Sequence, residues 1–245
     1  MSLQVFKISG QEIEESESLG LFARSIAALS RRPLIVHGGG REIDRLSQRL
    51  GLSPCFVGGQ RVTDAKTLNA AEMVLSGTAN KRLVRAFVAE GMPALGLSGC
   101  DLGLLTCRLP SLDLGLVGEP TAVNGEMLSK LLAQGILPIM SPIGLGPDFT
   151  ACNVNADVAA QALAIALRAR SLTFVTNVKG VMVGGIVRSR LTAAAARCAI
   201  VAGEITGGMI PKVKAALAAL EGGLSEVRIC DLSGLMEGGT VFSHD

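Results

Sequence analysis

The stretch Leu34-Ile-Val-His-Gly-Gly-Gly-Arg-Glu-Ile-Asp44 decides the fold, because an apolar strand runs through three consecutive glycines straight into a helical pattern. Glycines at a strand-to-helix junction let backbone N–H groups approach an anion, and the helix N-terminus behind them adds favourable dipole charge. The stretch therefore predicts a phosphate-binding loop. A tight turn would also select glycine, and the spacing matches neither G-x-x-x-x-G-K-[ST] nor G-x-G-x-x-G. The triplet alone leaves both interpretations open.

Composition limits the possible partners. The chain has 245 residues, 49% of them apolar, with no Trp or Tyr and only seven Phe. The net charge of +2, with both signs dispersed, gives no electrostatic footprint for nucleic acid, and aromatic platforms for stacking bases are lacking. We therefore expect a small-molecule partner and no nucleic acid.

The six cysteines are scattered without any C-x-x-C pair, and the two histidines are too few to complete a zinc site. Neither a metal site nor a disulfide framework is expected, and the thiols are typical of core residues in a reducing cytosol. The N-terminus lacks an apolar signal region, and no apolar run approaches 18 residues. These features predict a soluble, cytoplasmic protein that does not interact with membranes.

Short apolar runs alternate with longer Ala- and Leu-rich helical patterns, which predicts a mainly parallel sheet covered by helices on both faces. A looser stretch at 102–123 is expected to be a hairpin insertion, a second short hairpin is expected around Gly184-Gly185, and one continuous fold with two lobes should divide near residue 150. Strands are expected at 3–8, 33–37, 94–97, 137–143, 171–176, 226–230 and 240–242, and helices at 18–30, 41–50, 64–76, 79–90, 125–134, 156–168, 192–201 and 211–220.

Two lysines are candidates for binding an anion. Lys7 lies near the end of the first expected strand, where ligands of open parallel sheets bind, although a snorkelling lysine at a sheet edge is the plainer alternative. Lys212 follows Pro211, which suits the first position of a helix, so Lys212 and Lys214 are expected in an opening turn. Cations there oppose the helix dipole, which suggests an external anion unless solvent screens them.

Asp157 begins a strongly apolar helix. Taken alone, it is adequately explained as a first-turn carboxylate behind a capping Asn155. Asn153, Asn155 and Asp157 nevertheless alternate, which leaves open the alternative that the three side chains converge on one cavity. Arg61 lies in a glycine-rich segment before another helix, where a guanidinium suits bidentate recognition of a carboxylate, although surface exposure is the commoner outcome for an arginine.

Seven segments, taken in order, resemble the amino-acid kinase family, and within it the N-acetylglutamate kinases. Together they span nearly the whole chain, and the combination of Arg-Val-Thr-Asp with Asn-Val-Asn-Ala-Asp is the most specific. The segments are Lys7-Ile-Ser-Gly10, His37-Gly-Gly-Gly40, Gly59-Gln-Arg-Val-Thr-Asp64, Gly77-Thr-Ala-Asn-Lys-Arg82, Asp113-Leu-Gly-Leu-Val-Gly-Glu119, Asn153-Val-Asn-Ala-Asp157 and Gly207-Gly-Met-Ile-Pro-Lys212.

The resemblance implies a three-layer α/β/α sandwich with a mainly parallel central sheet, forming a single domain over residues 1–245. It implies a lobe at 1–150 that holds the substrate and contributes a homodimer contact, and a lobe at 151–245 that holds ATP. The implied activity is ATP- and Mg²⁺-dependent phosphorylation of the side-chain carboxylate of N-acetyl-L-glutamate, a step of arginine biosynthesis.

Residue roles also follow from the resemblance. Lys7 and Lys212 resemble the two transition-state lysines, and Asp157 resembles the carboxylate that orients both. Gly10, Gly39 and Gly40 correspond to backbone donors to the phosphoryl group, and Arg61 and Asn153, with Asn155 nearby, to the substrate clamp. The residues expected to meet the nucleotide are Asn177, Gly180, Met182, Glu204 and Thr206.

Two positions depart from the family pattern: Ser9 replaces the first of two paired glycines, and Asn177 stands where many members carry Asp. Two alternatives to the implied activity remain open. One is a sister kinase acting on aminoadipate held by a carrier protein, against which Val62 speaks because that sister commonly has Tyr there. The other is a catalytically silent amino-acid-binding regulatory domain, against which the retained Lys7, Asp157 and Lys212 speak.

Overall fold

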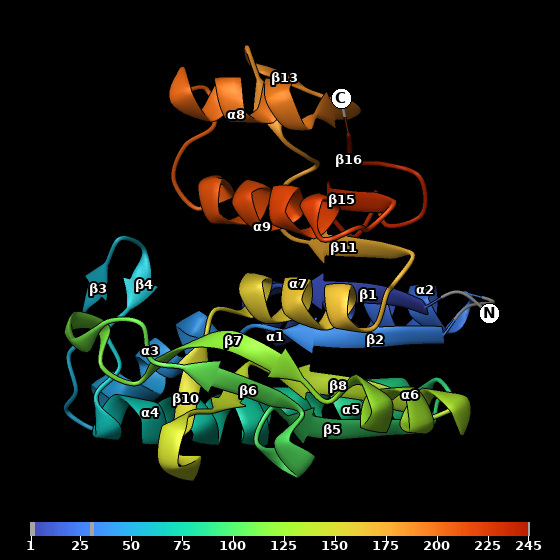
Figure 1. The fold of residues 1–245 in the computed structure, drawn as a ribbon. Helices are drawn as coiled ribbons and strands as arrows, with labels where there is room; N and C mark the ends of the chain where they lie inside the picture. Colours follow the sequence, from blue (N-terminus) through green and yellow to red (C-terminus); the bar gives the residue numbers. More distant parts are fainter. Residues whose placement is uncertain (1–2, 30–31, 245) are drawn as a thin grey trace.

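The structure is a computed structural model of the chain, and it describes residues 3–29 and 32–244. Within that part of the chain, eight strands form the central sheet (Figure 1). Neighbouring strands from β15 through β5 are parallel, whereas β16 runs antiparallel to β15. In spatial order the strands are β14 (Arg190–Thr192), β16 (Thr240–Ser243), β15 (Glu226–Cys230), β11 (Ser171–Val175), β1 (Leu3–Ile8), β2 (Arg32–His37), β8 (Leu137–Ser141) and β5 (Ala94–Ser98).

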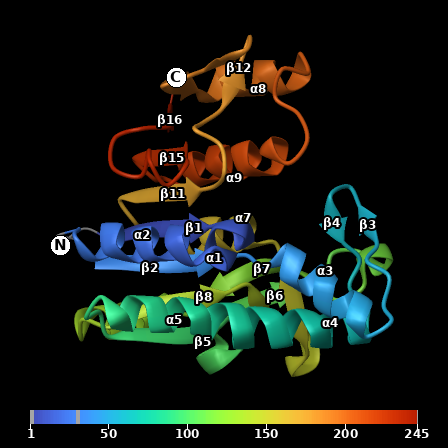
Figure 2. The same ribbon diagram turned by 180° about the vertical axis from the view of Figure 1, so that it is seen from behind.

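Helices cover both faces of this sheet, so the predicted three-layer α/β/α sandwich is confirmed (Figures 1 and 2). One face carries α6 (Gly125–Ala133), α7 (Ala156–Ala166) and α9 (Met209–Glu221), and α8 (Ala193–Val201) packs beside α9 and β14. The other face carries α1 (Gly10–Glu14), α2 (Ser16–Ala27), α3 (Gly40–Arg49), α4 (Ala65–Glu72) and α5 (Asn80–Ala89).

The core follows from the two-residue period of the strands, which sends successive side chains to opposite faces. Val5 of β1 joins the cluster beneath α7 and α9, whereas its neighbour Phe6 joins the cluster beneath α2 and α5. In that second cluster Phe22 and Phe87 meet edge to face, with ring centroids 5.8 Å apart. Two apolar layers therefore hold the sheet from both sides.

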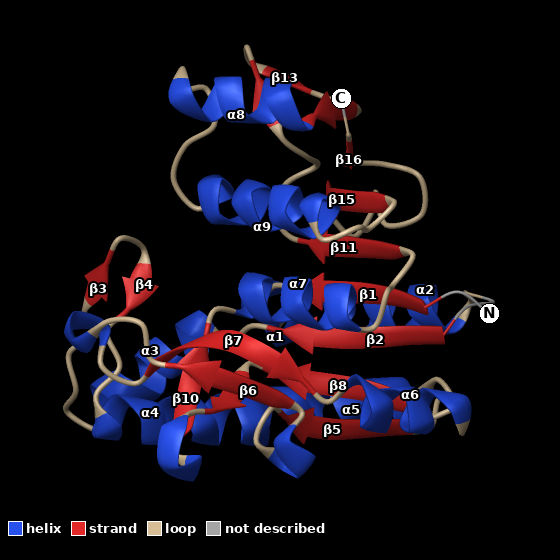
Figure 3. Cartoon of the chain, in the orientation of Figure 1, coloured by secondary structure: helices blue, strands red, loops and turns tan. Residues whose placement is uncertain are grey.

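The segment expected as a hairpin insertion is part of a larger unit (Figure 3). Strands β6 (Leu105–Arg108) and β7 (Val117–Val123) are antiparallel, as predicted, but they close into a small barrel with β9 (Ile143–Leu145) and β10 (Ala151–Val154). The expected strand at 137–143 was wrong in its extent, because Pro142 separates β8 from β9. The hairpin expected around Gly184-Gly185 is present as β12 (Met182–Val183) and β13 (Ile186–Val187), and β3 (Phe56–Val57) and β4 (Gln60–Arg61) form another.

Three further expectations need correction. The helices expected at 64–76 and 79–90 are not separated, because a π-helical stretch, Met73–Ala79, joins α4 directly to α5. Pro211 is the third residue of α9 rather than the first, so Lys214 lies in the second turn. The helix expected at 18–30 ends at Ala27, and residue 30 lies outside the described residues.

One ion pair ties α3 to α5. Both terminal nitrogens of Arg82 lie 2.8 Å from the two carboxylate oxygens of Glu42, and Nη1 also donates to the Ile13 carbonyl at 3.3 Å. The hydrogen bonds from Arg82 hold the pKa of Glu42 below its ordinary value, against the opposing effect of burial. Because the folded-state pKa is depressed, this stabilisation is present above the unfolded pKa and is lost as pH falls through the folded one.

We predict that Arg82→Lys lowers the free energy of unfolding at pH 7 by about 1 to 3 kcal/mol, because an ammonium cannot reproduce the planar two-pronged contact. Urea denaturation measures the change, and the gap from the unaltered protein should narrow in acid as Glu42 is protonated. Arg108→Lys is the matched control, since Arg108 pairs with Glu119 in an exposed bridge of little expected worth. Equal effects of the two substitutions would contradict the prediction.

Candidate active site

Three loops meet at the carboxyl ends of the central parallel strands. Ile8, at the end of β1, pairs with His37 of β2 on one side and with Val175 of β11 on the other. The segments that follow these strands therefore lie side by side, and they are Ser9–Gly10, Gly38–Gly40 and Thr176–Asn177. Ligands of open α/β sheets bind in this position, outside the carboxyl ends of the strands.

The first two loops touch through glycine backbone. A Cβ added at Gly10 would lie 2.8 Å from Gly39 Cα and 2.9 Å from Gly39 N, so only glycine allows this approach. The Gly38 N–H donates to the Ile8 carbonyl at 3.1 Å, which fixes the start of the second loop on β1. Gly39 then precedes α3, whose N-terminus adds dipole charge. The two loops thus form a backbone-lined cradle at the position where the sequence predicts a phosphate-binding loop.

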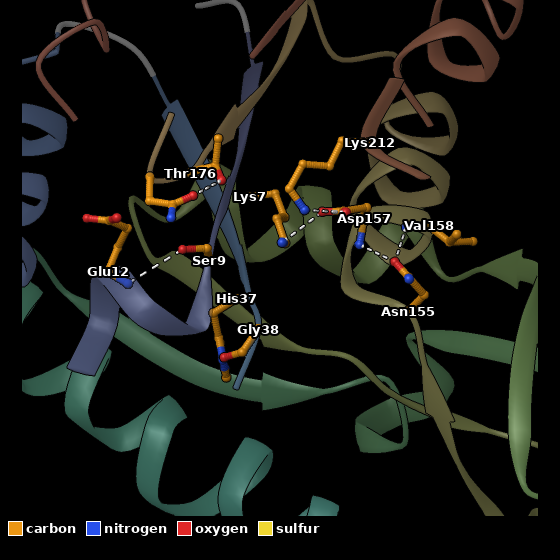
Figure 4. Close-up of polar contacts among 11 residues, drawn as sticks. Lys7, Ser9, Glu12, His37, Gly38, Asn155, Asp157, Val158, Thr176 and Lys212 are labelled. Atoms are coloured by element: carbon orange, nitrogen blue, oxygen red, sulfur yellow. Dashed lines mark hydrogen bonds and ion pairs between the residues drawn. The ribbon is translucent and has the colours of Figure 1, made fainter. Parts of the chain in front are cut away.

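Ser9, which departs from the family pattern, does not point into this cradle. Its hydroxyl caps α1 by accepting from the Glu12 N–H at 3.5 Å, and its own N–H donates to the Val175 carbonyl. Figure 4 shows the Ser9 side chain directed toward Glu12. Its hydroxyl is therefore engaged by the short helix α1.

Beside the cradle, Asp157 holds two lysines from distant parts of the chain (Figure 4). Lys7 Nζ lies 2.7 Å from Asp157 Oδ1, and Lys212 Nζ donates to Oδ2 at 3.0 Å. The side chains of Lys7 and Asp157 are only 7% and 6% exposed, so this contact is shielded from solvent. One carboxylate therefore contacts both lysines, which is the arrangement that the family resemblance implies for these three residues.

Two helices bring the three groups together. Asn155 caps α7 by accepting from the N–H groups of Asp157 and Val158, which places Asp157 in the first turn. Helix α7 packs across β1 and against α9, so Lys212, in the first turn of α9, reaches the same carboxylate. The plain interpretation of Asn155 as a helix cap is therefore correct, and its capping orients Asp157.

The charges at this point are unbalanced, with two ammonium groups facing one carboxylate. Burial lowers the pKa of Lys7, the Lys212 charge lowers it further, and the Asp157 charge opposes both effects. Burial alone would raise the pKa of Asp157, but the two lysines together hold it below its ordinary value. Asp157 is therefore ionised at neutral pH, and the group as a whole favours an additional anion.

A cavity of about 190 Å³ opens next to the glycine cradle. Arg61 lies on its wall, with Nη1 2.6 Å from Asp44 Oδ1 and Nη2 donating to the Gly40 carbonyl at 3.2 Å. The Phe56 ring stacks on the guanidinium, whose carbon lies 4.8 Å from the ring centroid. Arg61 is 9% exposed, so the surface position considered from the sequence was wrong.

Asn153, on β10, also lines this cavity. Its amide nitrogen donates to Thr63 Oγ1 at 3.1 Å, and Thr63 Oγ1 donates to the Arg61 carbonyl at 2.9 Å. The cavity therefore joins predicted residues from three regions of the chain. Its lining includes Gly39, Gly40, Arg61, Asn153 and Asn155.

A larger cavity of about 1090 Å³ continues from there toward α9. It is lined on one side by residues 58–60 of the β3–β4 hairpin and on the other by Gly207, Gly208 and Lys214. The two cavities share Gly59, Gln60, Val117 and Asn155, so they are adjoining parts of one depression.

The residues predicted to meet the nucleotide are placed around the carboxyl ends of the C-terminal strands. Asn177 follows β11 and is exposed, as are Met182 in β12 and Glu204 and Thr206 before α9. Gly180 is buried, and it is closely packed, since a Cβ added there would lie 2.7 Å from Thr240 Oγ1. None of the five lines either cavity described above, so their nucleotide role stays a prediction.

Several residues that build the site were missed by reasoning from sequence. Asp44 holds the Arg61 guanidinium, and it lies four residues beyond Gly40, on the same helix that begins at the cradle. His37 and Asn80 meet behind the glycine loop, with 3.2 Å between His37 Nε2 and Asn80 Nδ2. Both lie inside motifs noticed in the sequence, but only the folded chain brings them together.

We predict that Asp157→Asn lowers the pKa of Lys7 further, because the substitution removes the charge that raises it and leaves the opposing charge of Lys212. NMR titration of isotopically labelled lysine side chains measures this shift directly. Glu126→Gln, which removes the partner of the exposed Lys130, is the control and should leave Lys7 unchanged. A Lys7 pKa that stays the same or rises in Asp157→Asn would contradict the electrostatic account.

No helix within residues 3–29 and 32–244 is long and apolar enough to span a bilayer. Over the same ranges, no group of three or more His, Cys, Asp or Glu side chains is arranged to hold a metal ion.

Comparison with solved structures identifies close likenesses in fold. The crystal structure of smu.665 from Streptococcus mutans UA159 superposes with a TM-score of 0.90 at 28% identity, covering 99% of each chain. An N-acetylglutamate synthase from Neisseria gonorrhoeae, complexed with coenzyme A and N-acetyl-glutamate, has a TM-score of 0.87. The superposition covers all of this chain and 60% of the synthase chain. At 24% identity, the likeness concerns the fold alone.

Sequence comparison identifies relatives at higher identity than these solved structures. An acetylglutamate kinase from Roseiflexus sp. (strain RS-1) is 49% identical over 239 residues, covering 96% of this chain and 91% of that protein. One from Chloroflexus aurantiacus (strain ATCC 29366 / DSM 635 / J-10-fl) is 48% identical over 247 aligned positions, covering 99% and 97%. The model of the amino acid kinase family matches residues 2–231. The chain therefore belongs to the amino acid kinase family.

Proposed function

We propose that this protein is an ATP-dependent kinase that phosphorylates the side-chain carboxylate of N-acetyl-L-glutamate, giving N-acetyl-L-glutamyl 5-phosphate in arginine biosynthesis. The observation that carries the proposal is the convergence of Lys7 and Lys212 on Asp157 beside the glycine cradle. The relatives named acetylglutamate kinase, with up to 49% identity over nearly the whole chain, support the choice of acceptor.

The smaller cavity suits an acylated amino acid. In the proposal Arg61 receives the α-carboxylate, because Asp44 and the Gly40 carbonyl fix its guanidinium while other N–H donors remain for a ligand. Asn153 meets the acylamino group across the cavity, with Asn155 nearby. The side-chain carboxylate then extends toward the Gly39–Gly40 backbone, where the phosphoryl group is transferred.

The reaction needs no general base, because a glutamate side chain with a pKa near 4 is already deprotonated at neutral pH. Its carboxylate oxygen attacks the γ-phosphorus of ATP, and ADP leaves. The main obstacle is repulsion between a carboxylate and a polyphosphate, so alignment and charge neutralisation dominate. Lys7 and Lys212 supply positive charge, and Asp157 keeps both ammonium groups oriented.

Mg²⁺ fits this site as a companion of the nucleotide. Asp157, the carboxylate at the centre of the site, is already engaged by two lysines, and the described residues provide no three-ligand cluster. In the proposal the phosphates of ATP and water would hold the ion, which would neutralise phosphate charge when bound. In the proposal Gly10, Asn177, Gly180, Met182, Glu204 and Thr206 contact the nucleotide.

The proposed active form is a cytoplasmic homodimer joined through the N-terminal half. Strand β5 lies at the edge of the sheet, where its outer backbone groups lack a strand partner among the described residues. Apolar side chains lie exposed nearby, with Leu95 on β5 and Val88 on the adjacent α5 39% and 54% exposed. The six free thiols suit a reducing compartment.

We predict that Lys7→Met and Lys212→Met each lower kcat by about 100-fold or more, because each removes charge that neutralises the transition state. Steady-state kinetics at saturating substrates measures the loss, and thermal denaturation checks that the variants fold. Lys130→Met, on the surface of α6, is the control and should retain full turnover. Near-normal turnover in either active-site variant would reject the role given to that lysine.

We predict ADP release with N-acetyl-L-glutamate that exceeds the release with glutamate or N-acetylaminoadipate and needs no carrier protein. A coupled assay with each acceptor measures the preference as kcat/KM. Activity only toward aminoadipate on a carrier protein would identify the sister kinase instead. Ligand binding without any ADP release would identify a regulatory domain.

A further inference from the structure

We infer that His37, held by Asn80, is a positioning residue that fixes the orientation of the glycine cradle for phosphoryl transfer. The inference rests on the proposed kinase function and adds to it the groups that order the loop. Neither side chain touches the cavities, and both are buried, with His37 0% and Asn80 1% exposed. They lie behind Gly38–Gly40, on the side away from Lys7 and Lys212.

The hydrogen bonds determine which histidine nitrogen carries the proton. Asn80 Nδ2 donates to the Ile139 carbonyl at 2.9 Å, which fixes the orientation of the amide. The same nitrogen lies 3.2 Å from His37 Nε2, and because it is a donor, Nε2 accepts. The proton of the neutral ring is therefore on Nδ1, which donates to the Gly38 carbonyl at 3.1 Å.

A neutral ring is what the surroundings favour. Burial lowers the pKa of His37 to about 4, the hydrogen bond to Gly38 and the charge of Glu42 oppose this shift, and Lys7 and Lys81 reinforce it. A protonated ring would also direct an Nε2–H toward the Asn80 amide hydrogens. Near neutral pH, His37 is therefore a fixed donor to the loop.

Anchoring the Gly38 carbonyl also orients the next amide. The peptide between Gly38 and Gly39 is planar and trans, so its C=O and N–H point in opposite directions. When His37 holds the oxygen, the Gly39 N–H is directed away from His37, and Gly39 N lies beside Gly10. Three consecutive glycines have large backbone freedom, so the hydrogen bond from His37 is important because it restricts the conformation of the loop.

The surrounding structure is shaped to place Asn80. It is the first residue after the π-helical stretch Met73–Ala79, whose Leu75 lies close to Gly39. A Cβ at Gly96 of β5 would overlap Asn80 Oδ1, so glycine is required there. Lys81 Nζ donates to Asn80 Oδ1 at 3.1 Å and to the Gly96 carbonyl at 3.2 Å.

The test compares His37→Leu, which fills space without a donor, with His37→Asn, whose amide nitrogen takes the place of Nδ1. We expect His37→Leu to lower kcat by about 10- to 100-fold with the KM for N-acetylglutamate changed less than about twofold, as for a misplaced catalytic group. His37→Asn should recover part of that kcat. Gly96→Ala, which displaces Asn80, should lower kcat in the same way.

Ser171→Ala is the matched control, because it removes the hydrogen bond that the buried Ser171 hydroxyl accepts from Gln4 at the opposite end of the sheet. It should lower thermal stability while kcat stays unchanged. If His37→Leu loses stability but keeps kcat, or if His37→Asn recovers nothing, the positioning role is wrong. If His37→Leu does not fold, His37→Asn and Gly96→Ala provide the same comparison.

A second readout does not depend on activity. The chain has only two histidines, so ¹⁵N-labelled histidine gives two ring systems, and His244→Ala assigns them. We expect His37 near pH 7 to be neutral with its proton on Nδ1. A proton on Nε2 or a charged ring would overturn the inference even in an active enzyme. Failure of the unaltered protein to phosphorylate N-acetylglutamate would instead reject the proposed function. The NMR measurement of the His37 tautomer would still be valid in that case.

Discussion

The site depends on one buried carboxylate. Asp157 has to be ionised to hold Lys7 and Lys212 together, and those lysines are also what keep it ionised despite its burial. The group of three carries one excess positive charge in a poorly solvated position, which is costly without a further anion. Burial, reinforced by the charge of Lys212, holds the pKa of Lys7 below its ordinary value even though the Asp157 charge opposes both effects. In the proposed function, a transferring phosphoryl group beside the glycine cradle supplies the missing negative charge. The electrostatic demand of the fold and that of the proposed reaction then coincide.

The larger part of the fold could be predicted because its signals are local. A buried strand reads as a short apolar run and a covering helix as a longer apolar repeat, and the β1, β2 and β11 patterns suffice to indicate a parallel sheet. The barrel of β6, β7, β9 and β10 could not be predicted in the same way. Its strands have three to seven residues, and two of its four pairings join segments more than 30 residues apart. The five-residue α1 is likewise too short for a repeat.

The candidate site was predicted unevenly for the same reason. Lys7, Asp157 and Lys212 attract notice because each is a charged residue in an apolar strand or at the start of a helix, and the family resemblance connects them. Asp44 and Asn80 look like ordinary helix residues, and their importance lies in partners 17 and 43 positions away. Residues that act directly on a ligand therefore leave a local signal, whereas those that hold them depend on tertiary contacts.

The two lysines of the site are held by different parts of the fold and differ in their exposure to solvent. Asp157 lies on α7, which packs across β1 and β2, so the carboxylate and Lys7 belong to the centre of the sheet. Lys212 is the fourth residue of α9, which follows an exposed glycine-containing segment, and its side chain is 19% exposed, against 7% for Lys7. Of the two lysine contacts to Asp157, the one from Lys212 to Oδ2 is therefore the less shielded from solvent. Under the proposed function, the acceptor side is preorganised, and the second lysine completes the charge as the phosphates arrive.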